Sequence, residues 1–295
     1  MNKYLIIWLL AIVLVYLLSS CQDETVSPPP SDWPVINGEY LGQTLPGNTP
    51  IVFAPGIISK RGSDEWGLAV NENWTEIFFS RSENDKASIY HLERQSGIWT
   101  KPKLAEFSGR YDDSHPVFAD EGFRLFFGSK RPCPGSKTVL KLWFSEKKNG
   151  EWITPQSLGK PFTDQTVHAA SVSPDGNIYA TGLVVFEKGD FGYKPQHKLL
   201  PDISGSQPAI SPDGSYIVFS NRGKDGFGGN DLYVIFKKDD KTWDTPINLG
   251  KNINTKSVES SPTISRDGKF IFFSRNGDIW WVSSKVIEEL RSKNK

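Results

Sequence analysis

After residue 48 the chain alternates apolar and polar residues in short runs, which are separated by turn-forming residues. The clearest segment, 208–220, reads PAISPDGSYIVFS and has such a run on each side of Asp213-Gly214. Asp-Gly is a strong hairpin signal, because glycine readily adopts the positive φ that a tight turn requires. The pattern therefore predicts an antiparallel β-hairpin.

The same hairpin pattern recurs along the chain. Segments 170–182 and 262–274 are close copies with Asp-Gly turns, and segments 68–80 and 116–128 are degenerate copies. The turn positions are 73, 121, 175, 213 and 267, which are 48, 54, 38 and 54 residues apart. Five units of this length with almost no helical periodicity between them predict an all-β fold, a five-bladed β-propeller.

Each unit also carries signals for two outer strands. A third strand with an aromatic residue is expected around positions 89–90, 142–143, 232–233 and 279–280. A fourth begins with Trp-x-x-Pro at 99–102, 152–155 and 243–246, where proline suits an edge strand because no ladder donor is lost. The third unit offers only FGYKP at 191–195. We therefore expect four-stranded antiparallel blades, with the outer half of the third unit left open.

The segment 206–234 carries a resemblance to a known family. Its Ser-Pro-Asp-Gly hairpin, followed by a Phe-Ser strand and an Asp-Leu-Tyr strand, resembles TolB-type propeller repeats, which are WD40-like. The likeness spans about residues 50–284. It implies the propeller fold but permits many functions, because the family includes scaffolds, envelope proteins and accessory domains of peptidases and sugar-degrading enzymes.

The two ends of the repeat region are expected to close the propeller. The last unit, 259–284, lacks a fourth strand, and the isolated segment 49–56 resembles one. Pairing the two would remove exposed sheet edges. A sixth blade would have to come from the inserts around 130–140 or 182–205. The propeller is thus expected over 49–284, followed by a short helix and tail at 285–295, because Val286, Ile287 and Leu290 share one helical face.

The N-terminus has the features of an export signal. Lys3 precedes fifteen apolar residues at 4–18, fewer than the roughly 20 that a membrane-spanning helix needs. The following LLSSC at 17–21 resembles the lipobox of bacterial lipoproteins. We expect a signal peptide at 1–20, lipidated Cys21 and a Pro-rich tether at 21–48. The alternative is an uncleaved N-terminal anchor.

The lipobox resemblance implies a cell-envelope location, with the chain attached through the N-terminal lipid, and we expect the outer membrane, on its periplasmic or surface face. The acidic residues at 22–24 resemble a surface-export signal of lipoproteins of the Bacteroidetes type.

Charge and cysteine content narrow the possible partners and cofactors. The chain has 34 basic and 34 acidic residues, and loss of 1–20 removes only Lys3, which gives a net charge of −1. This balance gives no support for nucleic-acid binding. Cys133 has no cysteine partner once Cys21 is lipidated, and the four histidines show no metal-ligand spacing. No cofactor and no metal are therefore expected.

A ring of polar residues is expected at one mouth of the central channel. Residues eight positions before and after the turns lie at the same end of each hairpin, so Glu65 should face Arg81, and Glu259 should face Arg275. Further members of the predicted ring are Asp113, His115, His168 and Gln207. This ring could bind a ligand. The alternative is a set of cross-strand ion pairs that hold the hairpins in register.

Two other features allow a ligand but have simpler explanations. The Gly-rich run 225–231 resembles a calcium turn, although a single copy is better explained as a loop. Trp66 beside the predicted mouth could stack on a sugar, although a core position is the simpler interpretation.

The sequence identifies no reaction and no catalytic residue. We expect a scaffold that binds an envelope protein or a glycan. The alternative is a carbohydrate-active enzyme, a hydrolase or lyase, that uses Glu65, Asp113 and Glu259, because glycosidases need two carboxylates about 5–9.5 Å apart.

Overall fold

The computed structural model describes residues 33–119, 122–136, 139–203, 205–238 and 242–293. The predicted signal peptide, Cys21 and most of the tether lie outside these residues. Contacts divide the chain after Val35, and the unit from Ile36 onward contains all of the described strands. No described helix is long and apolar enough to cross a membrane.

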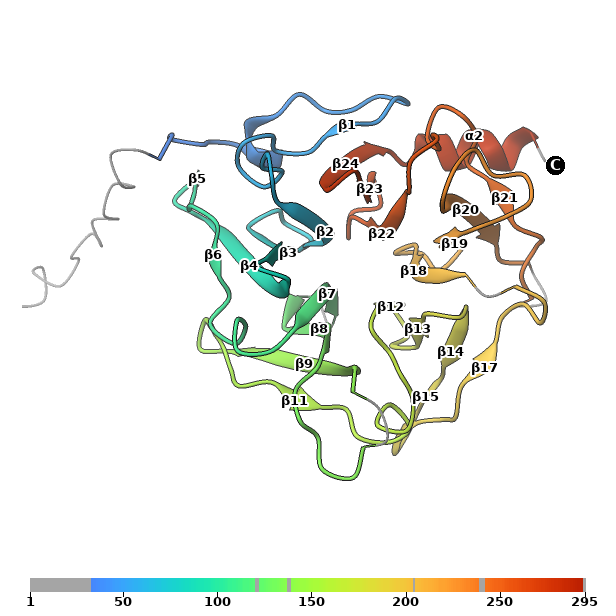
Figure 1. Ribbon diagram of the computed structural model, residues 1–295, viewed down its shortest axis with the longest axis horizontal. Helices are drawn as coiled ribbons and strands as arrows, with labels where there is room; N and C mark the ends of the chain where they lie inside the picture. The colour runs from blue at the N-terminus through green and yellow to red at the C-terminus, as the bar shows by residue number, and fades with distance from the viewer. Residues whose placement is uncertain (1–32, 120–121, 137–138, 204, 239–241, 294–295) are drawn as a thin grey trace, which may run out of the picture. The chain divides into compact units, whose positions relative to one another are not determined.

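Five antiparallel sheets surround a common centre in this unit (Figure 1). The first blade consists of β2 (Asp64–Val70), β3 (Glu76–Glu83), β4 (Lys86–Gln95) and β6 (Lys103–Leu104), with β5 (Ile98–Trp99) beside β4. The second consists of β7 (Asp113–Ala119), β8 (Arg124–Ser129), β9 (Lys141–Lys148) and β11 (Gln156–Ser157), with β10 (Glu151–Trp152) beside β9. Both follow the predicted order.

The third blade also has four strands, including the outer strands that the sequence did not predict. It consists of β12 (Ala170–Val172), β13 (Ile178–Ala180), β14 (Val184–Phe186) and β17 (His197–Lys198). The FGYKP segment instead forms part of a separate hairpin, β15 (Lys188–Gly189) with β16 (Gly192–Tyr193). The insert at 182–205 therefore completes the third blade and makes no sixth one, so the five-blade prediction is confirmed.

The last two blades show the predicted closure. The fourth consists of β18 (Ser206–Ile210), β19 (Tyr216–Asn221), β20 (Asp231–Phe236) and β21 (Ile247–Asn248). The fifth consists of β22 (Ser260–Ile264), β23 (Phe270–Arg275), β24 (Asp278–Ser283) and the N-terminal β1 (Ile51–Val52). Ile51 pairs with Trp281, and the adjacent Phe53 is fully buried against it. Closure thus covers the edge of β24 and joins the two ends of the propeller.

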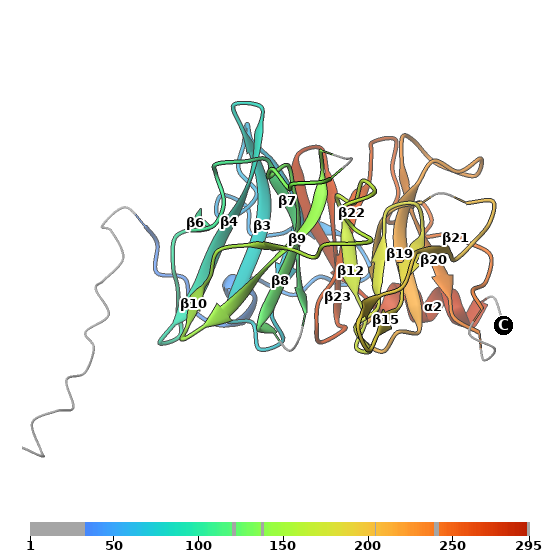
Figure 2. The ribbon, with the colours of Figure 1, turned by 90° about the horizontal axis from the view of Figure 1, so that it is seen from below.

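Apolar side chains fill the spaces between neighbouring blades, and the side view shows strands running between two opposite faces (Figure 2). One face carries the Asp-Gly turns, and we call it the turn face. The helix α2 (Lys285–Lys293) occupies the segment where the spacing predicts a helix, and its Val286 and Ile287 are buried against blades four and five. A single turn, η1 (Glu39–Gly42), precedes β1.

The second strands hold adjacent blades together through small side chains. The hydroxyl of Ser80 accepts a hydrogen bond from the backbone N–H of His115 in the next blade, at 2.9 Å. Ser220 and Ser274, at the same position of their blades, instead donate to the backbone carbonyls of Glu259 and Glu65 in the next blade. In blade two this position is Gly128, whose backbone packs directly on that of His168.

We predict that Gly128→Ala destabilises the protein, because its Cβ would overlap the carbonyl oxygen of His168. Overpacking by one methyl group should lower the free energy of unfolding by about 1–2 kcal/mol, which urea denaturation would measure. Gly47→Ala is the control, because a Cβ there meets no atom within 4 Å. Equal stability of the two variants would contradict this account of the blade contact.

Candidate functional site

The predicted acid–arginine pairs form inside the blades. The Nε of Arg81 donates to Glu65 at 2.8 Å, and the Nε of Arg275 donates to Glu259 at 2.7 Å. Glu65 and Glu259 are completely buried, and the arginines are 2% and 8% exposed. The guanidinium carbon of each arginine lies 4.6–5.1 Å from the centroids of two aromatic rings of its own blade, which are Phe79 and Tyr90 for Arg81.

Each pair also holds the connection that enters its blade. Arg81 donates to the carbonyl oxygen of Ile58, and Glu65 accepts from the hydroxyl of Ser63 at 2.6 Å. In blade five, Arg275 donates to the carbonyl of Ile253, and Thr255 donates to Glu259. The acid and the arginine therefore fix the linker from the preceding blade against the inner hairpin. We call these groups the blade clamps.

The second blade has a clamp with a partner that the sequence spacing missed. Asp113 is completely buried and accepts from Ser108, Ser129 and the guanidinium of Arg131. Counting eight residues from the turn gives Ser129, and the basic residue that follows it, Lys130, pairs with the neighbouring Asp112 at 2.6 Å. Burial raises the pKa of Asp113 and lowers that of Arg131.

The other two blades replace the clamp. At the equivalent positions blade three has Val167 and Leu183, both buried, and blade four has Gly205 and Asn221. The burial of Glu65, Asp113 and Glu259, each beside an arginine, is the arrangement that the ion-pair alternative expects. Any binding of a ligand by these residues stays a prediction.

The channel itself is crossed by a second set of residues. The inner strands of blades one, two, four and five each contain a bulge, at which Gly67, His115, Gln207 and Ser261 have φ near +50 to +57°. A bulge redirects side chains. The side chains of His115, Gln207 and Ser261 meet across the channel and form what we call the crossbar.

The hydrogen bonds of the crossbar determine the protonation of His115. The backbone N–H of Ser261 donates to Oε1 of Gln207, so the Gln207 amide presents its NH₂ group to Nε2 of His115, at 3.3 Å. Nε2 must then accept, and Nδ1 carries the proton toward Oγ of Ser114. Burial, together with nearby His168, lowers the pKa of His115 to about 3, which agrees with this neutral form.

His168 and Trp66 lie beside the crossbar. The rings of His168 and His115 meet edge-on at 5.6 Å, and the Trp66 ring is 6.3 Å from that of His115. Burial lowers the pKa of His168 as well. Both side chains are partly exposed. Of the predicted ring, therefore, His115, His168 and Gln207 lie at the channel, and the charged members lie in the clamps.

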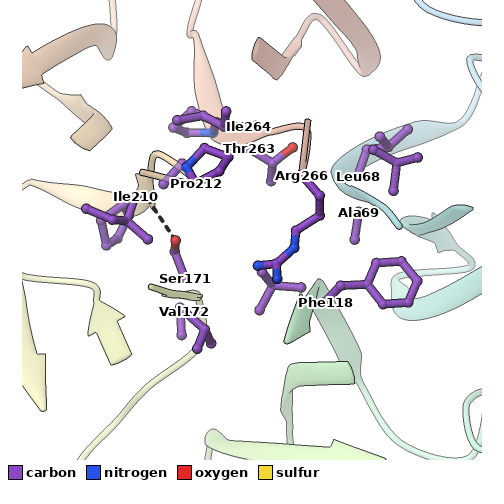
Figure 3. A pocket seen from close by; sticks show the side chains of 16 residues that line it. Leu68, Ala69, Phe118, Ser171, Val172, Ile210, Pro212, Thr263, Ile264 and Arg266 are labelled. Atoms are coloured by element: carbon purple, nitrogen blue, oxygen red, sulfur yellow. Dashed lines mark hydrogen bonds between the residues drawn. The ribbon is translucent and has the colours of Figure 1, made fainter. Parts of the chain in front are cut away.

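On the turn-face side of the crossbar lies an apolar hollow of about 50 Å³ (Figure 3). The strands of all five blades contribute to its wall, which includes Leu68, Phe118, Val172, Ile210 and Ile264. The Arg266 side chain extends across the opening. Small-molecule sites usually measure about 300–1,000 Å³, so a sugar ring cannot enter this hollow.

A larger hollow of about 290 Å³ adjoins the first and shares Pro212 with it. It lies between blades four and five and α2, and its charged lining residues are Asp213, Asp267, Glu288 and Arg291. Arg266 is partly buried and forms no ion pair with the described residues. Sequence reasoning missed Arg266, because in the repeat its position is otherwise the turn residue proline or an equivalent.

Two other sequence features have structural explanations. Asp225 accepts from the hydroxyl of Tyr233, and Asp231 accepts from the backbone N–H of Phe227, so both carboxylates hold the Gly-rich loop. Cys133 is a half-buried free thiol whose sulfur lies 3.6 Å from the hydroxyl of Ser157.

Comparison with known proteins shows the fold alone. The catalytic domain of a GH62 α-L-arabinofuranosidase from Coprinopsis cinerea matches 80% of this chain and 97% of its own, with a TM-score of 0.51 and 9% identity. TolB from Acinetobacter baumannii matches 75% of this chain, with a TM-score of 0.49 and 14% identity, and this chain spans only 55% of it. A gluconolactonase from Xanthomonas campestris matches 86% of this chain and 95% of its own, with a TM-score of 0.47 and 13% identity.

Sequence comparison adds no relative. No family model matches the chain, and no curated protein matches it in sequence. The chain is thus a five-bladed β-propeller whose structural neighbours include TolB proteins as well as enzymes.

Proposed function

We propose that this chain is a lipid-anchored binding module of the cell envelope, and that its turn face holds a segment of another envelope protein. The envelope location rests on the N-terminal sequence, in which a short apolar run leads directly to Cys21. The observation that carries the binding role is Arg266, which extends over an apolar hollow built by all five blades.

The chemistry of this face selects its occupant. A guanidinium binds carboxylates and phosphates, and the apolar wall favours a small aliphatic group below it. The adjoining hollow beside Asp213 and Arg291 extends the contact toward the rim. A polypeptide segment with an acidic residue next to a small apolar one supplies both groups. The hollow under Arg266 is too small for a sugar, which disfavours a glycan there.

The carboxylates that the enzyme alternative would use are not accessible to a substrate in this structure. Glu65, Asp113 and Glu259 are each fully buried and bound to an arginine, so they lack the access to substrate that a general acid needs. The likeness to an arabinofuranosidase comes with 9% identity and concerns the propeller fold alone.

The test is cross-linked affinity capture from whole envelopes, with the native chain, Arg266→Ala and Arg222→Ala. Arg222 is exposed and follows β19, at the opposite end of the hairpin from the turn. We expect one envelope protein to be captured by the native chain and by Arg222→Ala. Its affinity for Arg266→Ala should be weaker by about tenfold or more, as loss of a hydrogen bond to a charged group implies.

Two outcomes would contradict the proposal. Equal capture by Arg266→Ala would exclude the turn-face hollow as the binding site. Release of sugar products from envelope or plant glycans by the purified chain would instead support the enzyme alternative. All variants must show the same thermal melting before they are compared.

A further inference from the structure

A third hollow, of about 170 Å³, lies at the outer side of the propeller between blades one and two. Its wall includes Glu76 on β3, His91 and Glu93 on β4, and Trp152 of the second blade. Glu76 pairs directly with Glu93 across the two strands, and His91 is two residues before Glu93. Because side chains alternate along a strand, all three project from the same face of the sheet.

His91 and Glu76 depart from the repeat. In the other blades the position of His91 holds an apolar side chain, namely Phe144, Val184, Val234 or Trp281. The position of Glu76 holds Ile178, Tyr216 or Phe270 in blades three to five. Blade two has Arg124 and Glu146, paired with each other, at the positions of Glu76 and Glu93. The feature particular to blade one is therefore a histidine beside two carboxylates, which the propeller fold does not require.

The donor atoms are arranged as in a metal site. One ligand atom from each of Glu76, His91 and Glu93 lies within 4.8 Å of the other two. His91 is 7% exposed, and its ring stacks on Phe78 with centroids 4.2 Å apart, which fixes the plane of the imidazole. Its Nε2 lies 3.3 Å from Oε1 of Glu76, without the geometry of a well-formed hydrogen bond. A buried nitrogen with only a poorly aligned partner is costly, so its orientation toward two carboxylates points to a ligand.

The charge of the hollow favours a cation. Four carboxylates line it, those of Glu76, Glu93, Glu106 and Glu151. Lys103 is the one basic residue of the lining, and Lys147 lies 2.8 Å from Oε1 of Glu76. Four negative charges against two positive ones leave a net charge of −2 when His91 is neutral. Two carboxylates directly opposite each other in a sheet repel, and a divalent cation between them would remove that repulsion.

We propose that Glu76, His91 and Glu93 bind a zinc-type divalent cation, with a fourth coordination position open to the hollow. Zinc accepts imidazole nitrogen and carboxylate oxygen together, whereas calcium and magnesium prefer oxygen ligands alone. The contacts that described residues make with the Glu76 carboxylate, from Lys147, Trp152 and His91, all fall on Oε1. Oε2 and the partly exposed Glu93 provide the carboxylate oxygens for the metal.

Lys147 competes with the metal for Glu76 and so provides a sharp test. Its side chain is one-quarter exposed and can move into solvent. We expect Lys147→Met to bind zinc more tightly than the native chain, because the competing ammonium group is removed. A purely structural ion cluster predicts no Zn²⁺ binding by either chain, and only a loss of stability in Lys147→Met.

The experiment is isothermal titration of the full chain in detergent with Zn²⁺, and with Co²⁺ as a spectroscopic probe of coordination. We expect one equivalent to bind, with affinity reduced more than tenfold by His91→Ala and by Glu93→Gln, and unchanged by His197→Ala, whose side chain is exposed on β17. Glu93→Gln keeps the test valid if His91→Ala does not fold.

Three results would overturn the site. These are no binding of Zn²⁺ at millimolar concentration, equal binding by the native chain and Glu93→Gln, or weaker binding by Lys147→Met.

Discussion

Arg81→Leu is expected to lower the free energy of unfolding by about 3–5 kcal/mol, because it leaves a fully buried carboxylate without its cation. Glu65 is 0% exposed, and Arg81, which pairs with it at 2.8 Å, lies beside the rings of Phe79 and Tyr90. Urea denaturation, monitored by tryptophan fluorescence, would measure the loss. The exposed pair of Lys130 with Asp112 is the control, since Lys130→Leu should cost less than about 1 kcal/mol.

Blade three supplies a second variant that separates charge from packing. Val167 and Leu183 occupy the clamp positions there and are buried. The double variant Glu65→Val/Arg81→Leu copies this solution, and replacement of a buried ion pair by apolar residues is often neutral. We expect it to recover more than half of the stability lost by Arg81→Leu. A double variant less stable than the single one would show that the clamp itself stabilises the blade.

Acidification from pH 7 to 4.5 should remove roughly 2–3 kcal/mol of stability through His115 alone, at about 1.4 kcal/mol for each pKa unit. The pKa of His115 is about 3 in the folded chain and near 6.5 when unfolded. Below pH 6.5 the unfolded chain therefore binds the extra proton and is favoured. Neutral His115 therefore costs the folded chain no stability above pH 6.5, and the free energy of unfolding decreases as the pH falls from 6.5 toward 3. The lowered pKa of His168 adds a loss of the same sign.

The variant that tests this is His115→Gln. His115 has φ +54°, and Gln207 adopts φ +53° at the same bulge position of blade four, so the chain already accommodates glutamine there. Urea denaturation at pH 7 and at pH 4.5 should show that the free energy of unfolding changes less with pH in His115→Gln than in the native chain. The difference should be about the amount assigned to His115. His197→Gln is the control, because that side chain is exposed. An unchanged pH dependence in His115→Gln would contradict the neutral crossbar.

The blade clamps show which contacts of the site can be predicted from sequence spacing and which cannot. Glu65 and Arg81 are each eight residues from their turn, and the register of a two-stranded hairpin places them opposite each other. The same count failed for Asp113, whose partner is Arg131, because the chain leaves the strand after Ser129 and the arginine reaches back from the connection. Local periodicity describes a strand, but it does not describe the segment beyond the end of the strand.

The inner strands show a second limit of the sequence pattern. A bulge shifts the alternation of side chains by one residue, so residues after it face the side opposite to that predicted by a regular strand. The bulges at His115, Gln207 and Ser261 place these three in the channel, whereas the neighbouring acids enter the blade interior. Nothing in the alternation of apolar and polar residues marks the positions of these bulges.

The sequence by itself determined the all-β propeller, the five hairpins, the closing strand at 49–56 and the cross-strand partners of Glu65 and Glu259. These follow from turn chemistry and period-two alternation, which act between residues close in the chain or paired in one hairpin. Only the tertiary structure decided the crossbar and the hollow beneath Arg266. These depend on the packing of one blade against the next, which brings together residues that no local pattern relates.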